Sequence, residues 1–362
     1  MNIVAIHTEP GPVGWLRCWN WTTQLSYIGH NVRQKPDKGE QFDWADIDNY
    51  LRDADVVITC RMANAKIFAA LLAGRDLYHY KLVVDTDDNS DVLPEFNYAY
   101  PDYHSGSGVA RIARGELKAA DLVTVSTDYL GKWAKKYSPN VVTVPNCVNP
   151  RLYEGVKSRN KEPRHANDIR IYWGGGGGHY DDLLTIKEPV LRVFHENPNV
   201  KLVFSNILPD WAARLPASRV FFLRFAKFQA YPKLLRWLCA DVAIAPLVDN
   251  EFNRCKSNIK YLDYAMAGIP AVYQNLEPYK SVADGVTGLK ASTADEWYVA
   301  LNRLISDREL NRSISAAARE DVLATWNIDG HIKRYESMLE ELVNGVPRIP
   351  MQYLSEGVSL NA

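Results

Sequence analysis

The stretch Asp249-Asn-Glu-Phe-Asn-Arg-Cys-Lys-Ser-Asn-Ile-Lys-Tyr-Leu-Asp-Tyr-Ala-Met-Ala-Gly-Ile-Pro-Ala-Val-Tyr273 predicts a loop, a helix and a buried strand in succession. Lys256 and Lys260 are four positions apart and Asp263 follows three positions later, so on a helix these side chains would share one face. Gly268 can take the left-handed conformation that ends a helix, and the proline two positions later prevents continuation. A helix that begins with cations after a loop can hold an anionic ligand. An ordinary amphipathic helix with solvated lysines is an equally weighted alternative.

Short apolar runs alternate with helical stretches on both sides of this unit. The expected strands lie at 3–6, 56–59, 82–85, 122–125 and 141–144, then at 169–173, 200–204, 220–223, 242–245 and 270–273. The expected helices include 105–119, 129–137, 181–196, 230–239, 257–267 and 294–306. This alternation predicts an α/β protein built from parallel sheets covered by helices.

The length of 362 residues predicts two such domains. Pro145 precedes a polar and charged segment at 146–170, which contains Pro150 and Pro163 and is the expected linker. We therefore expect a first α/β domain at 1–149 and a second at 150–330. An amphipathic helix is expected at 331–346, and the tail at 347–362 has few helix signals.

The bulk composition is that of an ordinary globular protein. Hydrophobic residues make up 47%, charged residues 23%, and the formal net charge is −1, so the chain is not built to coat nucleic acid. Five scattered cysteines without a CxxC pair indicate reduced thiols rather than a disulfide framework or a zinc site. The first residues lack a signal-peptide pattern, and no uncharged run approaches the length of a membrane span. We expect a soluble, cytoplasmic protein, with peripheral membrane association left open.

Two glycine-containing segments are expected at carboxyl ends of strands, where open α/β sheets bind ligands. Gly11 and Gly14 follow the first strand; they permit close approach to a phosphate or sugar, and a plain turn is about as probable on sequence grounds. The run 174–178, which includes Gly175, Gly176 and Gly177, follows the strand at 169–173 and keeps five glycines despite their entropic cost. It lacks the Gly-Lys-Ser/Thr of a P-loop. Close backbone approach to a ligand and a merely flexible loop both fit this run.

Polar side chains at two further strand ends suit other parts of a ligand. Asp85, Asp87 and Asp88 end the strand at 82–85, and their carboxylates suit acceptor hydroxyls, a divalent metal or a helix cap; we favour the hydroxyls. In the opening stretch the two lysines suit a diphosphate, and Asp263 suits a ribose diol.

Several motifs together resemble a known family. They are Ala240-Asp-Val-Ala-Ile-Ala-Pro-Leu-Val-Asp249, the run from Phe252 to Val272, Pro278-Tyr279 and Gly285-Val-Thr-Gly-Leu289, with Ala119–Leu130 and Val144-Pro-Asn-Cys-Val-Asn149 upstream. The chain resembles the group 1 (family 4) retaining glycosyltransferases over about residues 115–340, and over 1–114 by pattern only.

The resemblance implies the GT-B fold, in which two Rossmann-like domains face a cleft and the second domain holds most of the nucleotide-sugar. It also implies that the final helix crosses back to the first domain. The family's two glutamates, eight positions apart, fall on Cys255 and Asp263, so the ribose-binding acid is kept and the acid that contacts the donor sugar is a cysteine here. Lys256, Ser257 and Lys260 are the implied diphosphate-binding residues.

The expected function is that of a retaining hexosyl- or pentosyltransferase, which moves a sugar from a nucleoside-diphosphate sugar to a hydroxyl acceptor without a metal or cofactor. Lys256, Lys260 and His104 are the expected catalytic residues, and His179 is expected beside the donor. The first 150 residues hold 15 Lys+Arg and 18 Asp+Glu, so glycan, lipid-linked, protein, small-molecule and modified-DNA acceptors all stay open. The alternatives are a degenerate nucleotide- or glycan-binding module, or another GT-B enzyme such as a nucleotide-sugar epimerase or hydrolase.

Overall fold

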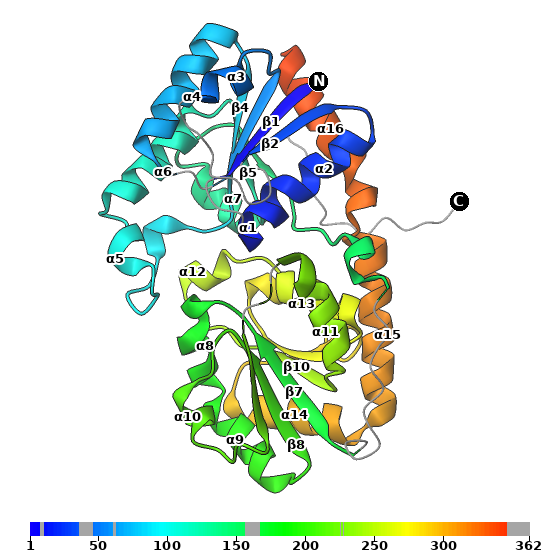
Figure 1. Ribbon diagram of the computed structural model, residues 1–362. Helices are drawn as coiled ribbons and strands as arrows, with labels where there is room; N and C mark the ends of the chain where they lie inside the picture. The colour runs from blue at the N-terminus through cyan, green and yellow to red at the C-terminus, as the bar shows by residue number, and fades with distance from the viewer. Residues whose placement is uncertain are drawn as a thin grey trace.

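A computed structural model describes residues 1–7, 11–35, 46–60, 63–155, 167–224, 226 and 228–345 of the chain. These residues form two α/β domains, which lie one above the other in Figure 1. The predicted tail at 347–362 and the part of the predicted linker at 156–166 fall outside the described residues. No helix among the described residues is long and apolar enough to cross a membrane.

The first domain is built on a six-stranded parallel sheet in the order β2-β1-β3-β4-β5-β6. Its strands are β1 (Asn2–His7), β2 (Asn31–Lys35), β3 (Val56–Cys60), β4 (Lys81–Thr86), β5 (Leu122–Val125) and β6 (Val141–Thr143). Central strands such as β3 and β5 are apolar and buried along their whole length, because helices cover both faces of the sheet. The predicted α/β class is therefore confirmed for this domain.

The second domain repeats this plan with a parallel sheet in the order β12-β11-β10-β7-β8-β9. Its strands are β7 (Ile169–Gly174), β8 (Val200–Ser205), β9 (Val220–Leu223), β10 (Val242–Ala245), β11 (Ala271–Gln274) and β12 (Leu289–Ala291). The predicted boundary at residue 149 lies between the last strand of the first sheet and the first strand of the second.

Helices cover both faces of each sheet. In the first domain they are α1 (Pro12–Gly14), α2 (Asn20–Tyr27), α3 (Ile47–Leu51), α4 (Ala65–Tyr78), α5 (Tyr100–Tyr103), α6 (Gly108–Ala119) and α7 (Asp128–Ala134). After the first sheet come α8 (Tyr180–Thr185), α9 (Lys187–Glu196), α10 (Asp210–Ala213), α11 (Tyr231–Leu238), α12 (Glu251–Arg254), α13 (Ile259–Ala267), α14 (Ala294–Ser306), α15 (Arg308–Thr325) and α16 (Ile328–Asn344). Each sheet has one hydrophobic core on either face.

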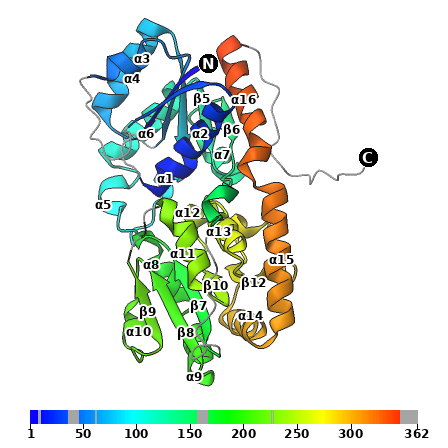
Figure 2. The ribbon, with the colours of Figure 1, turned by 45° about the vertical axis from the view of Figure 1, so that its right-hand side comes forward.

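The chain passes between the domains twice, and the two passages are hydrogen-bonded to each other. The backbone N–H of Val148 donates to Trp326 O at 2.9 Å, and that of Ile328 donates to Val148 O at 3.0 Å. Figure 2 shows α15 alongside the second domain and α16 alongside the first. The last helix thus belongs to the core of the first domain, and it begins at Ile328, before the predicted residue 331.

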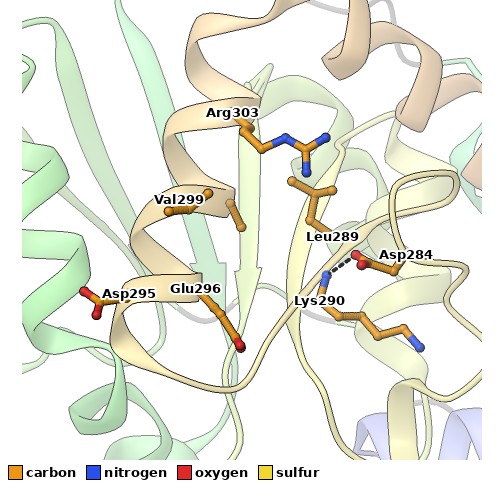
Figure 3. A pocket seen from close by; sticks show the side chains of 8 residues that line it. Asp284, Leu289, Lys290, Asp295, Glu296, Val299 and Arg303 are labelled. Atoms are coloured by element: carbon orange, nitrogen blue, oxygen red, sulfur yellow. Dashed lines mark hydrogen bonds between the residues drawn. The ribbon is translucent and has the colours of Figure 1, made fainter.

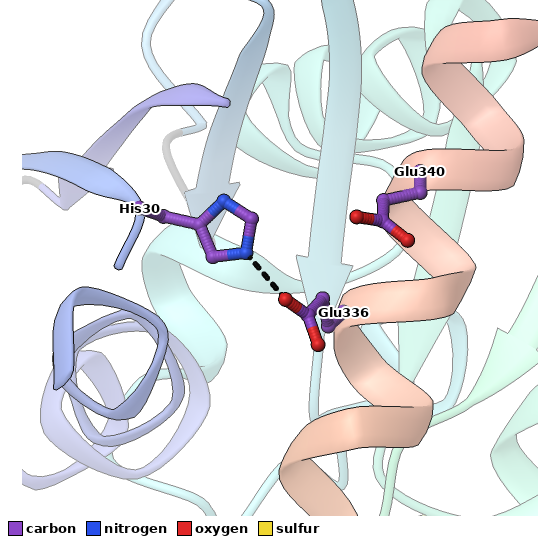
Figure 4. A group of neighbouring side chains, drawn as sticks. All are labelled: His30, Glu336 and Glu340. Carbon is purple, nitrogen blue, oxygen red and sulfur yellow. Dashed lines mark hydrogen bonds and ion pairs between the residues drawn. The ribbon is translucent and has the colours of Figure 1, made fainter. Parts of the chain in front are cut away.

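Polar contacts also attach α16 to the first domain (Figure 4). His30 Nε2 lies 2.8 Å from Glu336 Oε1, and Lys333 Nζ lies 2.9 Å from the other oxygen of that carboxylate. Glu340 lies one turn further along α16, and the ligand atoms of His30, Glu336 and Glu340 are all within 4.8 Å of one another. Because both oxygens of Glu336 already have partners, we interpret this group as a support for the helix.

Candidate functional site

Loops that follow the carboxyl ends of the strands in the two sheets contact each other. Asp88, after β4, has Oδ1 3.6 Å from Nζ of Lys256, after β10. Asn146, after β6, donates from Nδ2 to Ser257 Oγ at 2.7 Å. In the second sheet the strand order reverses between β7 and β10, and open α/β sheets bind ligands at such a point. The glycine loop after β7 and the segment after β10 meet there.

Lys260 lies on the first turn of α13 and points back to the end of β7. Its ammonium group donates to the carbonyl oxygen of Gly174 and lies 5.0 Å from the centre of the Trp173 ring. Burial, with a smaller contribution from the charge of Lys256, lowers the pKa of Lys260 to about 8, although nearby carboxylates oppose the shift. A bound anion would compensate the lost hydration of this ammonium group, so the site favours a negatively charged ligand.

Asp263 lies one turn further along the same helix. The hydroxyl of Tyr153 donates to its Oδ1 at 2.6 Å. Burial raises the pKa of Asp263 to about 6, while this hydrogen bond and the charge of Lys260 hold the rise in check. The carboxylate is therefore mostly ionised at pH 7 and can accept hydrogen bonds from hydroxyl groups of a ligand.

A buried carboxylate joins the glycine loop to the segment after β10. Asp182 Oδ2 lies 2.6 Å from His179 Nδ1, and its Oδ1 accepts from the backbone N–H of Val248 at 2.7 Å and from Asn253 Nδ2 at 2.9 Å. Burial lowers the pKa of His179 to about 4, and the neighbouring lysine charges add to this effect. His179 is thus neutral at pH 7. The hydrogen bond to Asp182 places the imidazole proton of His179 on Nδ1, which leaves Nε2 as an acceptor.

The glycine loop owes its composition to close contacts rather than to left-handed backbone, since none of residues 174–178 has a positive φ. A Cβ on Gly175 would lie 3.0 Å from Lys260 Nζ and 2.7 Å from the neighbouring indole ring. A Cβ on Gly176 would meet nothing within 4 Å. The space that a side chain at Gly176 would occupy is therefore open, one residue from the contact of Gly175 with Lys260.

The other end of the glycine loop touches the first domain. A Cβ on Gly177 would lie 3.1 Å from the ring of Tyr98, and one on Gly178 would lie 2.8 Å from Asn97 Nδ2. A side chain at Gly178 would require the amide of Asn97 to move, and one at Gly177 would require a small shift of the Tyr98 ring. The glycines thus allow the domains to meet at this loop.

The predicted helix is present, but the expectation that Lys256 and Lys260 share one of its faces is wrong. The helix expected at 257–267 begins at Ile259, so Lys256 lies in the loop before it and shares no helical face with Lys260. The loop directs Lys256 toward the first domain, where its Nζ lies 3.6 Å from Asp88 and 4.4 Å from the centre of the Phe252 ring. The predicted helix end at Gly268 is confirmed by its left-handed φ of 77°.

Cys255, in the same loop, is buried against the first domain. Its Sγ lies 3.6 Å from Asn89 Nδ2, and its carbonyl oxygen accepts from Thr127 Oγ1 at 3.0 Å. The side chain is 1% exposed and packs with the hydrophobic core of the first domain. Burial raises the pKa of the thiol to about 11, so it is neutral at pH 7.

Asp85 is buried inside the first domain. Arg17 binds both of its oxygens, from Nε at 3.0 Å and Nη2 at 2.8 Å, and Thr124 Oγ1 donates to it at 2.6 Å. Arg17 Nη1 also donates to Asn146 Oδ1 at 2.9 Å, and Asn146 in turn donates to Ser257. Asp85 therefore anchors a chain of hydrogen bonds that ends in the lysine-containing loop of the second domain.

The predicted glycines after β1 begin a helix. Gly11 precedes α1, and the helical backbone continues through a π-helical turn at Trp15–Trp19 into α2. A Cβ on Gly14 would lie 2.6 Å from the ring of His7, so this glycine permits close packing of β1 against the helix. The π-helical turn carries Arg17.

His104 and Asp87 lie on the first-domain side. His104 caps α5, its ring lies 5.4 Å from that of Tyr100, and its Nδ1 accepts from the backbone N–H of Gly106 at 3.3 Å. Asp87 is half-buried and adjacent to Asp88. Both belong to the segment that follows β4.

The structure thus brings together most residues predicted for the nucleotide-sugar, namely the glycine loop, His179, Lys256, Ser257, Lys260 and Asp263, and it places Asp85 apart from them. Sequence reasoning missed Asp182, Tyr153, Arg17 and Asn146. The spacing of three between His179 and Asp182 was an available signal, since it places two side chains on one face of a helical turn. Tyr153 and Arg17 carried no such signal.

A separate hollow lies between β12 and α14 (Figure 3). It is lined by charged and apolar side chains: Asp284, Leu289, Lys290, Asp295, Glu296, Val299, Ala300 and Arg303. Strands β10 and β11 separate β12 from β7, so this hollow is not part of the lysine cluster. None of the predicted site residues lines it.

Comparison with known proteins identifies the fold. No protein-family model matches the sequence, and no curated protein is detectably similar to it. HepE of Anabaena in complex with UDP-glucose is 13% identical with a TM-score of 0.64, over 94% of this chain and 100% of that chain. Sucrose-phosphate synthase from Thermosynechococcus elongatus is 13% identical with a TM-score of 0.65, over 95% and 100%. A glycosyltransferase from Rickettsia africae is 11% identical with a TM-score of 0.64, over 94% and 98%. At these identities the likeness establishes the fold, so the predicted GT-B fold is confirmed.

Proposed function

We propose that this protein is a retaining glycosyltransferase, which transfers a hexose or pentose from a nucleoside-diphosphate sugar to a hydroxyl group without a divalent cation. The observation that carries the proposal is the convergence of the charges of Lys256 and Asp263 on Lys260, which contacts the glycine loop at the switch point of the second sheet. The fold shared with HepE, which was solved with UDP-glucose, supports a nucleotide-sugar as the ligand.

The two lysines have the chemistry that the leaving group requires. When the bond between the anomeric carbon and the phosphate oxygen breaks, its electron pair moves to the diphosphate. Cations fixed in advance beside that oxygen stabilise the developing charge without a metal ion. In a retaining reaction the acceptor hydroxyl attacks the face that the diphosphate leaves, and its proton passes to the departing phosphate oxygen. No protein nucleophile is required.

The neighbouring polar groups suit the rest of the donor. Asp263, held by Tyr153, would accept hydrogen bonds from the ribose hydroxyls. His179 Nε2 would accept a hydrogen bond from a hydroxyl of the transferred sugar, because Asp182 holds the proton on Nδ1. We propose that the acceptor approaches from the first domain, where Asp87 and His104 lie.

The test begins with Lys256→Ala. It is expected to abolish transfer while the melting temperature without ligand stays near that of the wild type. A thermal-shift screen against UDP-, GDP- and ADP-sugars first identifies the donor, because a ligand that binds the folded state raises its stability. Lys280→Ala is the matched control, since Lys280 is exposed and pairs with Glu277. Unchanged turnover in Lys256→Ala would refute the role of this lysine.

Cys255 favours a second candidate function, a binding module that holds a nucleotide or glycan without transfer. The family to which the sequence is similar has an acid at this position, and here the thiol is buried against the first domain. Product analysis with and without acceptors separates the alternatives. Transfer requires an acceptor, a hydrolase releases free sugar without one, and an epimerase returns an altered nucleotide-sugar. Nucleotide binding without any turnover would support the module.

A further inference from the structure

The segment after β4 exposes several large aromatic side chains at the boundary between the domains. Phe96 is 45% exposed, Tyr98 75% and Tyr103 43%. Soluble proteins bury most side chains of this size, and neighbouring exposed aromatic groups are a common mark of a binding surface. We call Phe96, Tyr98 and Tyr103 the aromatic surface. Figure 1 shows its helix, α5, on the side of the first domain that faces the second.

Local hydrogen bonds hold this segment in place. Asn97 is buried, its Oδ1 accepts from the backbone N–H of Ala99 at 3.0 Å, and its carbonyl oxygen accepts from the N–H of Tyr100 at 2.8 Å. The N–H of Tyr103 donates to Ala99 O at 3.0 Å. The rings are therefore presented on a turn that is already ordered, and a ligand would not need to order it on binding.

The segment that carries these rings meets the proposed nucleotide-sugar site at two points. At its beginning, Asp88 Oδ1 lies 3.6 Å from Lys256 Nζ. Further along, the ring of Tyr98 lies so close to Gly177 that a Cβ there would approach it to 3.1 Å. Residues 88–98 thus run from the lysine loop to the glycine loop. A molecule on the aromatic surface would lie next to the donor.

The charge of this segment restricts the molecule that can bind. From Leu82 to Ala110 the chain contains no lysine or arginine, while it contains six acids: Asp85, Asp87, Asp88, Asp91, Glu95 and Asp102. Cations from other segments pair with three of them, since Arg17 binds Asp85, Lys256 lies near Asp88 and Arg114 binds Asp91. Proteins that bind nucleic acid or anionic lipid neutralise phosphates with lysine and arginine. Glu95 and Asp102 are exposed beside the rings, so a polyanion would be repelled here.

We propose that the aromatic surface is the acceptor subsite and that the acceptor is an uncharged saccharide stacked on Phe96 and Tyr98. The C–H groups on one face of a sugar ring carry partial positive charge and pack against the negative face of an aromatic ring. The hydroxyls on the edge of the sugar remain available to the tyrosine hydroxyls and to the donor. This inference rests on the proposed function, and it narrows the acceptor to one chemical class.

The experiment measures acceptor and donor binding separately. Maltotetraose, cellotetraose and chitotetraose are titrated into the full-length protein in the presence of UDP and followed by saturation-transfer NMR. A DNA duplex containing 5-hydroxymethylcytosine and phosphatidylglycerol vesicles are titrated in parallel. The variants are Phe96→Ala and Tyr98→Ala. Tyr27→Ala is the matched control, because Tyr27 is 72% exposed on α2 and is not part of the aromatic surface.

The expected result is that at least one saccharide binds and that its dissociation constant rises about tenfold in each surface variant, as loss of a good stacking contact implies. Tyr27→Ala should leave it unchanged. The affinity of Phe96→Ala for UDP should stay within about twofold of that of the wild type. This variant therefore reports on saccharide stacking alone, whereas Tyr98→Ala also removes the contact with Gly177. The proposal would be overturned if none of the saccharides binds, or if DNA or vesicles bind in their place. It would also be overturned if saccharide affinity is unchanged in both variants. Failure of the proposed function itself would appear as absence of binding of UDP, GDP and ADP to the wild type.

Discussion

Replacement of Lys260 by methionine separates binding of the nucleotide from stability of the fold. Lys260 is half-buried against Trp173 and Gly174, and its pKa falls from 10.5 to about 8. The folded protein therefore holds an ammonium group at a cost of up to about 3 kcal/mol at pH 7, because each pKa unit corresponds to about 1.4 kcal/mol. Methionine removes this cost and also the hydrogen bond to Gly174, so the melting temperature of Lys260→Met should stay level or rise.

UDP affinity should respond in the opposite direction. A charge-assisted hydrogen bond contributes about 1.5–3 kcal/mol, so Lys260→Met should weaken UDP binding about 10- to 100-fold. The pH dependence follows from the pKa of about 8. Below this pH the ammonium group is present before binding. Above it, binding must take up a proton, since the bound diphosphate raises the pKa of the lysine.

Isothermal titration calorimetry of wild type and Lys260→Met between pH 6.5 and 9.5 tests this reasoning. The ratio of the two dissociation constants should be flat below pH 7.5 and should shrink about tenfold between pH 8 and 9.5. Any titration of UDP itself is common to both proteins and cancels in the ratio. A ratio that does not change with pH, or a variant that binds UDP as the wild type does, would refute the assignment of Lys260 to the diphosphate.

Two further predictions concern stability. Arg17→Met should destabilise the protein by about 3–5 kcal/mol in urea unfolding, because it leaves Asp85 buried without its cation. Arg33→Met, which breaks the partly exposed pair with Asp53, should cost less than about 1 kcal/mol, and equal losses in the two variants would contradict this reasoning. Burial raises the pKa of Glu116 from 4.5 to about 8, so wild-type stability should fall as the pH rises from 5 to 8, where the unfolded chain is ionised and the folded one is not. Glu116→Gln should remove that slope and be more stable than the wild type at pH 8 by on the order of 3 kcal/mol. Parallel curves of unfolding free energy against pH for the two proteins would contradict the raised pKa of Glu116.

The strands found from sequence include the central strands that are buried on both faces and two edge strands, β6 and β9. Central strands such as β10 consist of apolar residues, because helices cover the sheet on either side. The two strands that were missed are at sheet edges. In β2 the sequence Asn31-Val-Arg-Gln-Lys35 is polar and none of its residues is buried, and β12 has three residues. The edge strands β6 and β9 were found because they contain consecutive apolar residues, which the polar β2 and the short β12 lack.

The candidate site was predictable in part for a similar reason. Loops after parallel strands gather at one edge of the sheet, so the glycine loop and the segment with Lys260 could be placed together before the structure was known. Contacts between distant parts of the chain could not be predicted in this way. Tyr153 and Asp263 are separated by 110 residues, and Asp182 and Val248 by 66. Neither pairing follows from any local pattern.

The position of Cys255 explains why a cysteine is suitable there. In this domain arrangement its side chain lies among buried groups of the first domain, and its polar contact is with the amide of Asn89. A glutamate at this position would bury a carboxylate beside an amide and aliphatic groups, which costs free energy unless a cation compensates. The adjacent Lys256 is turned toward Asp88 and Phe252 instead. The residue thus serves contact between the domains. A sugar held beside Lys260 would then take its polar contacts from His179 and from the first domain.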